Sequence, residues 1–124
     1  MSNLNPVTNI SNYVDALFNV ATDASQTEVI NLGGRVLTGI YMPAAWTAAS
    51  LTFLASYDGV NFFPIYDTAG TEVSATAAAS TFIAINPVAW FGTLHYLKIR
   101  SGTAALPVNQ AANRTLTLIL GDPN

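Results

Sequence analysis

Two strand-like runs meet at an Asp-Gly pair in the stretch Leu51-Thr52-Phe53-Leu54-Ala55-Ser56-Tyr57-Asp58-Gly59-Val60-Asn61-Phe62-Phe63-Pro64-Ile65-Tyr66. In the first run every second residue belongs to one predicted buried face, which consists of Leu51, Phe53, Ala55 and Tyr57. This alternation has the period of a β-strand that buries one side. Asp58-Gly59 supplies the positive φ that a tight hairpin turn needs. The stretch therefore predicts an antiparallel hairpin.

Further strand-like runs lie on both sides of this hairpin, separated by turn-forming residues. They are predicted at Tyr13 to Val20, Glu28 to Leu32, Arg35 to Met42, Thr71 to Thr76, Ser80 to Ile85, Leu94 to Arg100 and Thr115 to Leu120. Gly33-Gly34 is expected to form a two-residue hairpin turn or a β-bulge, and Asp67 to Gly70 another turn. About eight short, regularly spaced strands are typical of a sandwich. We predict an all-β, antiparallel two-sheet β-sandwich that is jelly-roll-like.

Helix is expected to contribute very little. The alanine-rich segment Ala75 to Ala79 favours a helix by propensity alone, but it is far shorter than the ~12 residues that make an isolated helix credible, and β-branched residues lie on both sides. Pro43 to Ala49 is expected to be a loop or one short helical turn. The connection through Val88 to Gly92 is expected to contain at most one helical turn.

The last two predicted strands indicate which side chains face the core. In Leu94 to Arg100, one face carries His95, Leu97 and Ile99, and the other carries Tyr96, Lys98 and Arg100. In Thr115 to Leu120 the threonines are expected to point outward and the leucines inward. The predicted core between the two sheets contains Leu51, Phe53, Leu97, Ile99, Leu116 and Leu118.

The composition indicates a subunit of an assembly. Hydrophobic residues make up 51% of the 124 residues and charged residues 9%, against about 25% charged in an ordinary domain. A surface with so few charges favours association, so neighbouring chains are expected to cover much of it. The length fits one domain. We assign residues 1–12 to an extended N-terminal arm, rich in Asn and Ser with Pro6, and residues 13–124 to the β-sandwich domain.

Several classes of partner and location are disfavoured. The net charge is −3 and the four basic residues are dispersed, so no nucleic-acid partner is expected. No apolar run approaches the roughly 18 to 20 residues that span a bilayer, so no membrane association is expected. The amino terminus lacks the features of a secretory signal, which predicts assembly in a cytoplasm. Cysteine is absent, so neither disulfides nor thiolate metal sites are predicted.

No constellation of residues predicts catalysis. His95 is the sole histidine and has no sequence-linked carboxylate or nucleophile arrangement, so packing or an interface hydrogen bond is its expected role. Four oxygen donors close in sequence could hold calcium, but they lack the spacing of a calcium loop: Asp58, Asn61, Asp67 and Glu72. Asp58 is assigned to its turn instead. We predict no catalytic, cofactor-binding or metal-binding residues, and hence a protein that is not an enzyme.

The aromatic residues allow two interpretations. The set that could form a sugar-stacking platform is Trp46, Phe62, Phe63, Tyr66, Trp90 and Tyr96. Core packing and contacts between subunits explain the same residues equally well. Both interpretations stay open from the sequence.

Two segments also carry a family resemblance. Ser50 to Tyr66, followed by Leu94 to Arg100, is similar to the discoidin and galactose-binding-like jelly roll, in which an alternating strand ending in Ser precedes Asp-Gly and an aromatic residue. A narrower pattern resembles small structural proteins of tailed-bacteriophage virions. It comprises Asp58 to Phe62, Ile65 to Asp67, Tyr96 to Thr103 and Pro107 to Leu118. Residues 1–30 match neither pattern.

The second resemblance implies a non-enzymatic virion subunit, with a capsid decoration or cement protein that binds and stabilises the phage head as the first expectation. Its implied partners are further copies of itself, in a homo-oligomer expected to be a trimer, and the major capsid protein or another virion protein. The implied location is the virion, after assembly in the host bacterial cytoplasm. A tail or fibre-linked adaptor and a carbohydrate-binding β-sandwich module are the alternatives.

Overall fold

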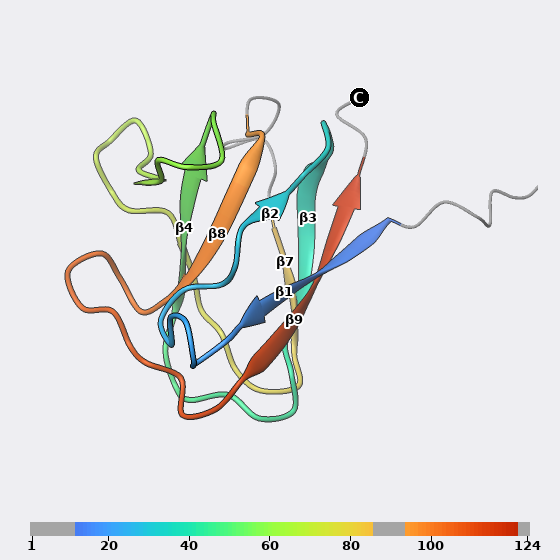
Figure 1. Ribbon diagram of the computed structural model, residues 1–124, viewed down its shortest axis with the longest axis vertical. Coiled ribbons are helices and arrows are strands. Elements are labelled where there is room, and N and C mark those ends of the chain that lie inside the picture. Colours follow the sequence, from blue (N-terminus) through green and yellow to red (C-terminus); the bar gives the residue numbers. More distant parts are fainter. Residues whose placement is uncertain (1–11, 86–93, 122–124) are drawn as a thin grey trace, which may run out of the picture.

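The computed structural model describes residues 12–85 and 94–121, which form two antiparallel sheets and contain no helix (Figure 1). The strands are β1 (Tyr13–Phe18), β2 (Ile30–Asn31), β3 (Val36–Tyr41), β4 (Leu51–Ser56), β5 (Phe63–Pro64), β6 (Ser74–Ala75), β7 (Phe82–Ala84), β8 (Tyr96–Ser101) and β9 (Arg114–Gly121). Accordingly, no helix in these two ranges is long and apolar enough to cross a bilayer. The predicted all-β, two-sheet sandwich is confirmed.

The strands pair in a nested order. β1 pairs with β9, β2 with β8 and β3 with β7, while β4 pairs with β5 and β6. One sheet therefore has the order β1-β9-β3-β7, and the other has the order β2-β8-β4-β5 with β6 also beside β4. Figure 1 shows β4 and β8 on one side of the molecule and β3 and β9 on the other. This is the jelly-roll arrangement, in which an antiparallel ribbon is wrapped so that its arms alternate between two sheets.

The hydrophobic core lies between the two sheets. The four-stranded sheet contributes the buried side chains of Ala16, Phe18, Leu37, Ile40, Leu116, Leu118 and Leu120, and the five-stranded sheet those of Ile30, Leu51, Phe53, Leu97 and Ile99. All six predicted core residues are among them. In β9 the buried leucines alternate with exposed or half-buried threonines, which confirms the predicted register.

The predicted hairpin is present, with a wider turn than expected. Ala55 of β4 lies opposite Phe63 of β5, and Gly59 between them has a φ of +78°. Residues 57–62 connect the strands, so the prediction of a tight turn was wrong. Tyr57, predicted to be on the buried face, is 76% exposed because β4 ends at Ser56 and Tyr57 already belongs to the loop.

The outer face of β4 also differs from the prediction, because it is buried rather than open to solvent. Thr52 is fully buried and Leu54 nearly so. Above them the Arg100 guanidinium forms an ion pair with Glu72 at 2.6 Å and donates from Nε to Thr52 Oγ1 at 3.0 Å. Thr52 Oγ1 in turn donates to the Gly102 carbonyl at 2.8 Å. β4 is thus covered on both faces.

Gly33-Gly34 forms a turn of a different kind from the two predicted. Both glycines have positive φ, +63° and +81°, and Arg35 N donates to the Leu32 carbonyl at 3.1 Å across the turn. The flanking strands β2 and β3 do not pair, because they belong to opposite sheets. The turn therefore carries the chain from one sheet to the other, and the prediction of a hairpin turn or a bulge was wrong.

The remaining segments agree with the predictions where the structure describes them. Most of the predicted strands are present but shorter, Pro43 to Ala49 is a loop, and Ala75 to Ala79 contains no helix. The Asp67 to Gly70 turn is present, with Gly70 at a φ of +85°. The predicted arm, except Asn12, and the connection through Val88 to Gly92 lie outside the described residues.

Candidate functional site

The loop between β4 and β5 is organised by the carboxylate of Asp58. Its Oδ1 accepts hydrogen bonds from the backbone N–H groups of Val60 at 2.8 Å and Asn61 at 2.9 Å, and from Ser56 Oγ at 2.8 Å. Its Oδ2 accepts from Asn61 Nδ2 at 2.9 Å. Gly59 N donates to Ser56 Oγ at 2.8 Å. The loop is therefore held in one conformation by its own polar groups, and the predicted turn role of Asp58 is confirmed.

These hydrogen bonds also change the acidity of Asp58. The backbone N–H groups of Asn61 and Val60, followed by the Ser56 hydroxyl and the Asn61 amide, hold the pKa of Asp58 well below its usual range. All of these donors stabilise the ionised carboxylate more than the neutral acid. The turn is thus maintained by a negative charge that persists to acidic pH.

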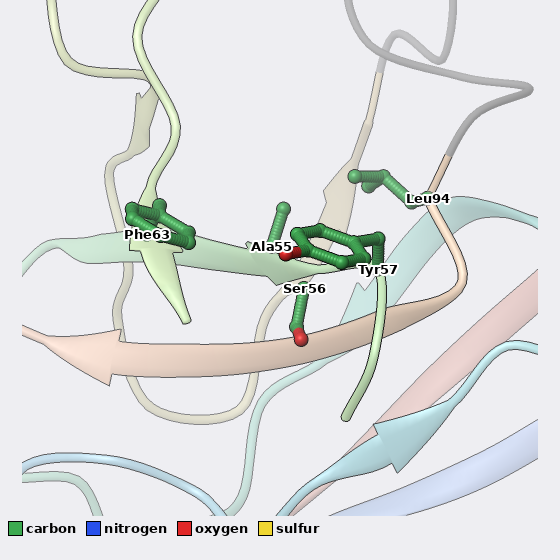
Figure 2. Close-up of a pocket in the computed structure, with 5 residues that line it drawn as sticks. All are labelled: Ala55, Ser56, Tyr57, Phe63 and Leu94. Atoms are coloured by element: carbon green, nitrogen blue, oxygen red, sulfur yellow. The ribbon is translucent and has the colours of Figure 1, made fainter. Parts of the chain in front are cut away.

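The same hairpin carries an unusual share of exposed apolar surface. Tyr57, Val60, Phe63 and Tyr66 are 76%, 78%, 60% and 50% exposed. Ala55, Ser56, Tyr57, Phe63 and Leu94 line a pocket of about 290 Å³, which we call the hairpin pocket. Figure 2 shows Ala55 between the rings of Tyr57 and Phe63. The arrangement is an apolar contact surface with few polar groups, built on a turn that does not need to be ordered on binding.

A second pocket has the opposite character. It has a volume of about 440 Å³ and is lined by Thr22, Asp23, Gln26, Thr27, Glu28, Val29 and Lys98, and we call it the Lys98 pocket. The loop that precedes β2 supplies six of these residues, and β8 supplies Lys98. The Lys98 ammonium lies 4.9 Å from the centroid of the Phe62 ring, a cation–π contact. This pocket offers both hydrogen-bond donors and hydrogen-bond acceptors.

The predicted calcium donors do not converge on one point. Asp58 and Asn61 bond to each other within one turn, and Asp67 accepts from the N–H groups of Ala69 and Thr71 in another. Glu72 is paired with Arg100. Among the described residues no group of three or more His, Asp or Glu side chains is placed to hold a metal ion. His95 is exposed and immediately precedes β8.

The predicted aromatic platform is divided between different environments. Trp46 packs edge-on against Phe18 with ring centroids 5.4 Å apart, and its Nε1 donates to the Ala49 carbonyl. Phe62 contacts Lys98, whereas Phe63 and Tyr66 are exposed on the hairpin. Tyr96 is half-buried, and Trp90 lies outside the described residues. The sequence therefore identified Phe63 and Tyr66 as candidate exposed aromatic residues of the hairpin. It missed Tyr57, because the strand period assigned that residue to the interior.

Sequence reasoning also missed the Lys98 pocket. Lys98 is far along the chain from Gln26 and Glu28, and no local spacing connects it with them. The only available signal was the outward position of Lys98 on its strand.

Comparison of the chain with protein-family models, curated proteins and solved structures finds no match.

Proposed function

We propose that this chain is a non-enzymatic structural subunit of a phage virion, of the capsid decoration or cement type, that attaches to the head through the β4–β5 hairpin. The observation that carries the proposal is the cluster of exposed apolar side chains on the hairpin, Tyr57, Val60, Phe63 and Tyr66. Exposed apolar side chains that cluster in this way mark contact surfaces, whereas scattered ones are ordinary.

The rigidity of the hairpin supports this role. Binding costs free energy wherever a loop must be ordered, and the Asp58 hydrogen bonds already fix this loop. Aromatic side chains in such a position contribute large contact areas with little loss of rotamer freedom. The low proportion of charged residues, 9%, fits a protein whose surface is covered by neighbours.

In this proposal the partners are other copies of the chain, as a trimer, and the major capsid protein. The chain works in the virion after assembly in the bacterial cytoplasm. Attachment to the tail or to a fibre is the alternative within the same class. A carbohydrate-binding module ranks behind both, because the predicted stacking platform has lost Trp46 and Phe62 to contacts within the protein.

The test compares two sets of exposed apolar residues in purified particles. Tyr57→Ser with Phe63→Ser removes the hairpin contacts, and Leu106→Ser, at an equally exposed position in the loop before β9, is the matched control. We expect the double variant to occupy particles at least about tenfold less while its melting temperature is unchanged, because interface anchors of this kind dominate binding. Quantitative mass spectrometry of particles and circular dichroism provide the two readouts.

Two results would contradict the proposal. The first is full occupancy of the double variant, which would place the attachment surface elsewhere. The second is an intact protein that stays monomeric by light scattering and never co-purifies with particles.

A further inference from the structure

We propose that the Lys98 pocket is a binding site for a neutral glycan. This inference concerns a different part of the molecule from the hairpin pocket and does not depend on the proposed role in assembly. The Lys98 pocket lies on the β2–β8 side of the five-stranded sheet, whereas the hairpin pocket lies at the β4–β5 side. Its volume of about 440 Å³ falls within the range of small-molecule sites.

The wall of the Lys98 pocket is held rigidly against β8. Thr27 N donates to the Ile99 carbonyl and Ser101 N to the Ser25 carbonyl, both at 2.8 Å. Ile99 N donates to the buried Thr27 Oγ1 at 3.0 Å, and Glu28 N donates to Leu17 O on β1. The backbone that carries the pocket side chains is therefore fixed before any ligand arrives, which lowers the cost of binding.

Several polar groups of the pocket have no hydrogen-bond or ion-pair partner in the part of the chain that the structure describes. Among the described residues, the side chains of Gln26 and Glu28 make no hydrogen bond and no ion pair. Asp23 uses Oδ1 to accept from Ser25 N and Oγ, and its Oδ2 makes no such bond. The Lys98 ammonium lies over the face of the Phe62 ring and makes no hydrogen bond or ion pair with another described residue, so its three N–H donors stay available. The pocket thus presents carboxylates, an amide and an ammonium group to solvent.

This combination matches a ligand with neighbouring hydroxyl groups. A sugar hydroxyl both donates and accepts, so it can satisfy a carboxylate and an ammonium or amide group at the same time. The exposed side chain of Val29 adds an apolar surface for the C–H face of a sugar ring. The two carboxylates outnumber the one ammonium group, which disfavours phosphorylated and other anionic ligands. No metal-binding cluster is present in the described part of the chain, so a divalent cation is a poorer fit.

The test is an amide NMR titration of the whole protein with glucose, galactose, mannose and N-acetylglucosamine, each to tens of millimolar. These probes cover both orientations of the sugar 4-hydroxyl, both orientations of the 2-hydroxyl, and an acetamido group. We expect at least one of them to shift the amides of residues 22–29 and 98 and to leave those of Tyr57, Phe63 and Tyr66, the exposed aromatic residues of the hairpin, unchanged. Glycerol, which offers hydroxyls without a ring, is expected to produce no saturable shift.

Two variants assign the binding to the proposed groups. Glu28→Gln and Lys98→Met remove one charged acceptor and one charged donor, and each is expected to weaken the sugar about tenfold, as for other hydrogen bonds to charged groups. Asp15→Asn changes an exposed carboxylate on β1, in the other sheet, and is expected to bind like the wild type. All three positions are accessible, so folding of each variant is checked by the same spectra.

The inference is overturned if none of the four sugars shifts the pocket amides, if the shifts fall on Tyr57, Phe63 and Tyr66 instead, or if glycerol acts as the sugars do. It is also overturned if both charge variants bind like the wild type. A basic peptide that shifts the same amides in a salt-dependent manner, with no response to sugars, would assign the pocket to a protein partner instead. None of these results bears on particle occupancy, which tests the assembly proposal separately.

Discussion

Strands β4 and β9 both bury large inward side chains in the core and differ in what lies over their outer faces. In β9, Leu116, Leu118 and Leu120 are buried and the residues between them are exposed or half-buried. In β4 the residues on both faces are buried from Leu51 to Leu54. A strand of a two-sheet protein can therefore belong to two packed layers when other segments cross its outer face.

The outer cover of β4 is polar and is supplied by distant parts of the chain. Glu72 and Arg100 form its ion pair, and both carboxylate oxygens of Glu72 also accept from Ala104 N at 3.2 Å. A largely buried pair of this kind gives little net stability relative to apolar packing, but its partners are costly to separate. The pair therefore fixes how the segment before β6 and the loop after β8 lie on β4.

The largest expected effect tests the equality of the two inward faces. Leu51→Ala in β4 and Leu118→Ala in β9 each remove a fully buried side chain. Each substitution should lower the free energy of unfolding by about 2 to 5 kcal/mol, because a cavity is left between the sheets. Urea denaturation followed by tryptophan fluorescence measures both. A loss of less than about 0.5 kcal/mol for Leu118→Ala would mean that the register of β9 is reversed.

A smaller effect separates the outer faces. Thr52→Val in β4 removes the hydroxyl that accepts from Arg100 and donates to Gly102, so buried partners are left unsatisfied. We expect a loss of about 1 to 3 kcal/mol. Thr117→Val in β9 removes a longer contact, 3.5 Å to Asp15, at the surface, and should change stability by less than about 0.5 kcal/mol. Equal values for the two variants would refute the difference between the strands.

The smallest effect concerns the end of β4. The low pKa of Asp58 in the folded state, relative to about 3.9 in an unfolded chain, means that its charge stabilises the fold above pH 4. That contribution is lost progressively as the pH falls from the unfolded-state pKa through the lower, folded-state pKa. Carbon-detected NMR of the Asp58 carboxyl group should therefore show a midpoint well below about 3.9. In the Asp58→Asn variant, the part of the pH dependence of the unfolding free energy that comes from this carboxyl group should vanish. A wild-type titration midpoint at the ordinary value would show that the turn is not preorganised.

The contrast between the strands also explains which parts of the fold could be predicted. β9 faces solvent on its outer side, so its Thr-Leu alternation gave the correct register and core residues. The outer side of β4 does not face solvent, because Glu72 and the loop near Gly102 cover Thr52. No local periodicity of the sequence encodes these contacts. Gly33-Gly34 shows the same limit: its positive φ was predictable, but which sheets it joins depends on pairing with distant strands.

The two pockets could be predicted to different degrees. Apart from Leu94, the residues that line the hairpin pocket come from one short stretch of sequence, and Phe63 was already among the candidate aromatic residues. Tyr57 was assigned to the interior because the strand was predicted to extend beyond Ser56. The Lys98 pocket depends on the loop before β2 lying against β8. Glu28 and Lys98 are ordinary charged residues in the sequence, and only the folded chain brings them to one pocket.

Nested strand pairing makes the order of synthesis matter for this fold. Tyr13 lies opposite Ile119, so β1 gains its neighbour in the sheet only when β9 has emerged from the ribosome. Pairing between such distant segments is slow, because the entropy cost of closing a long loop comes before any contact can offset it. Until then the apolar inward side of β1, with Ala16 and Phe18, has no neighbouring strand in its sheet. The nascent chain is therefore expected to be most prone to aggregation while β9 is still inside the exit tunnel.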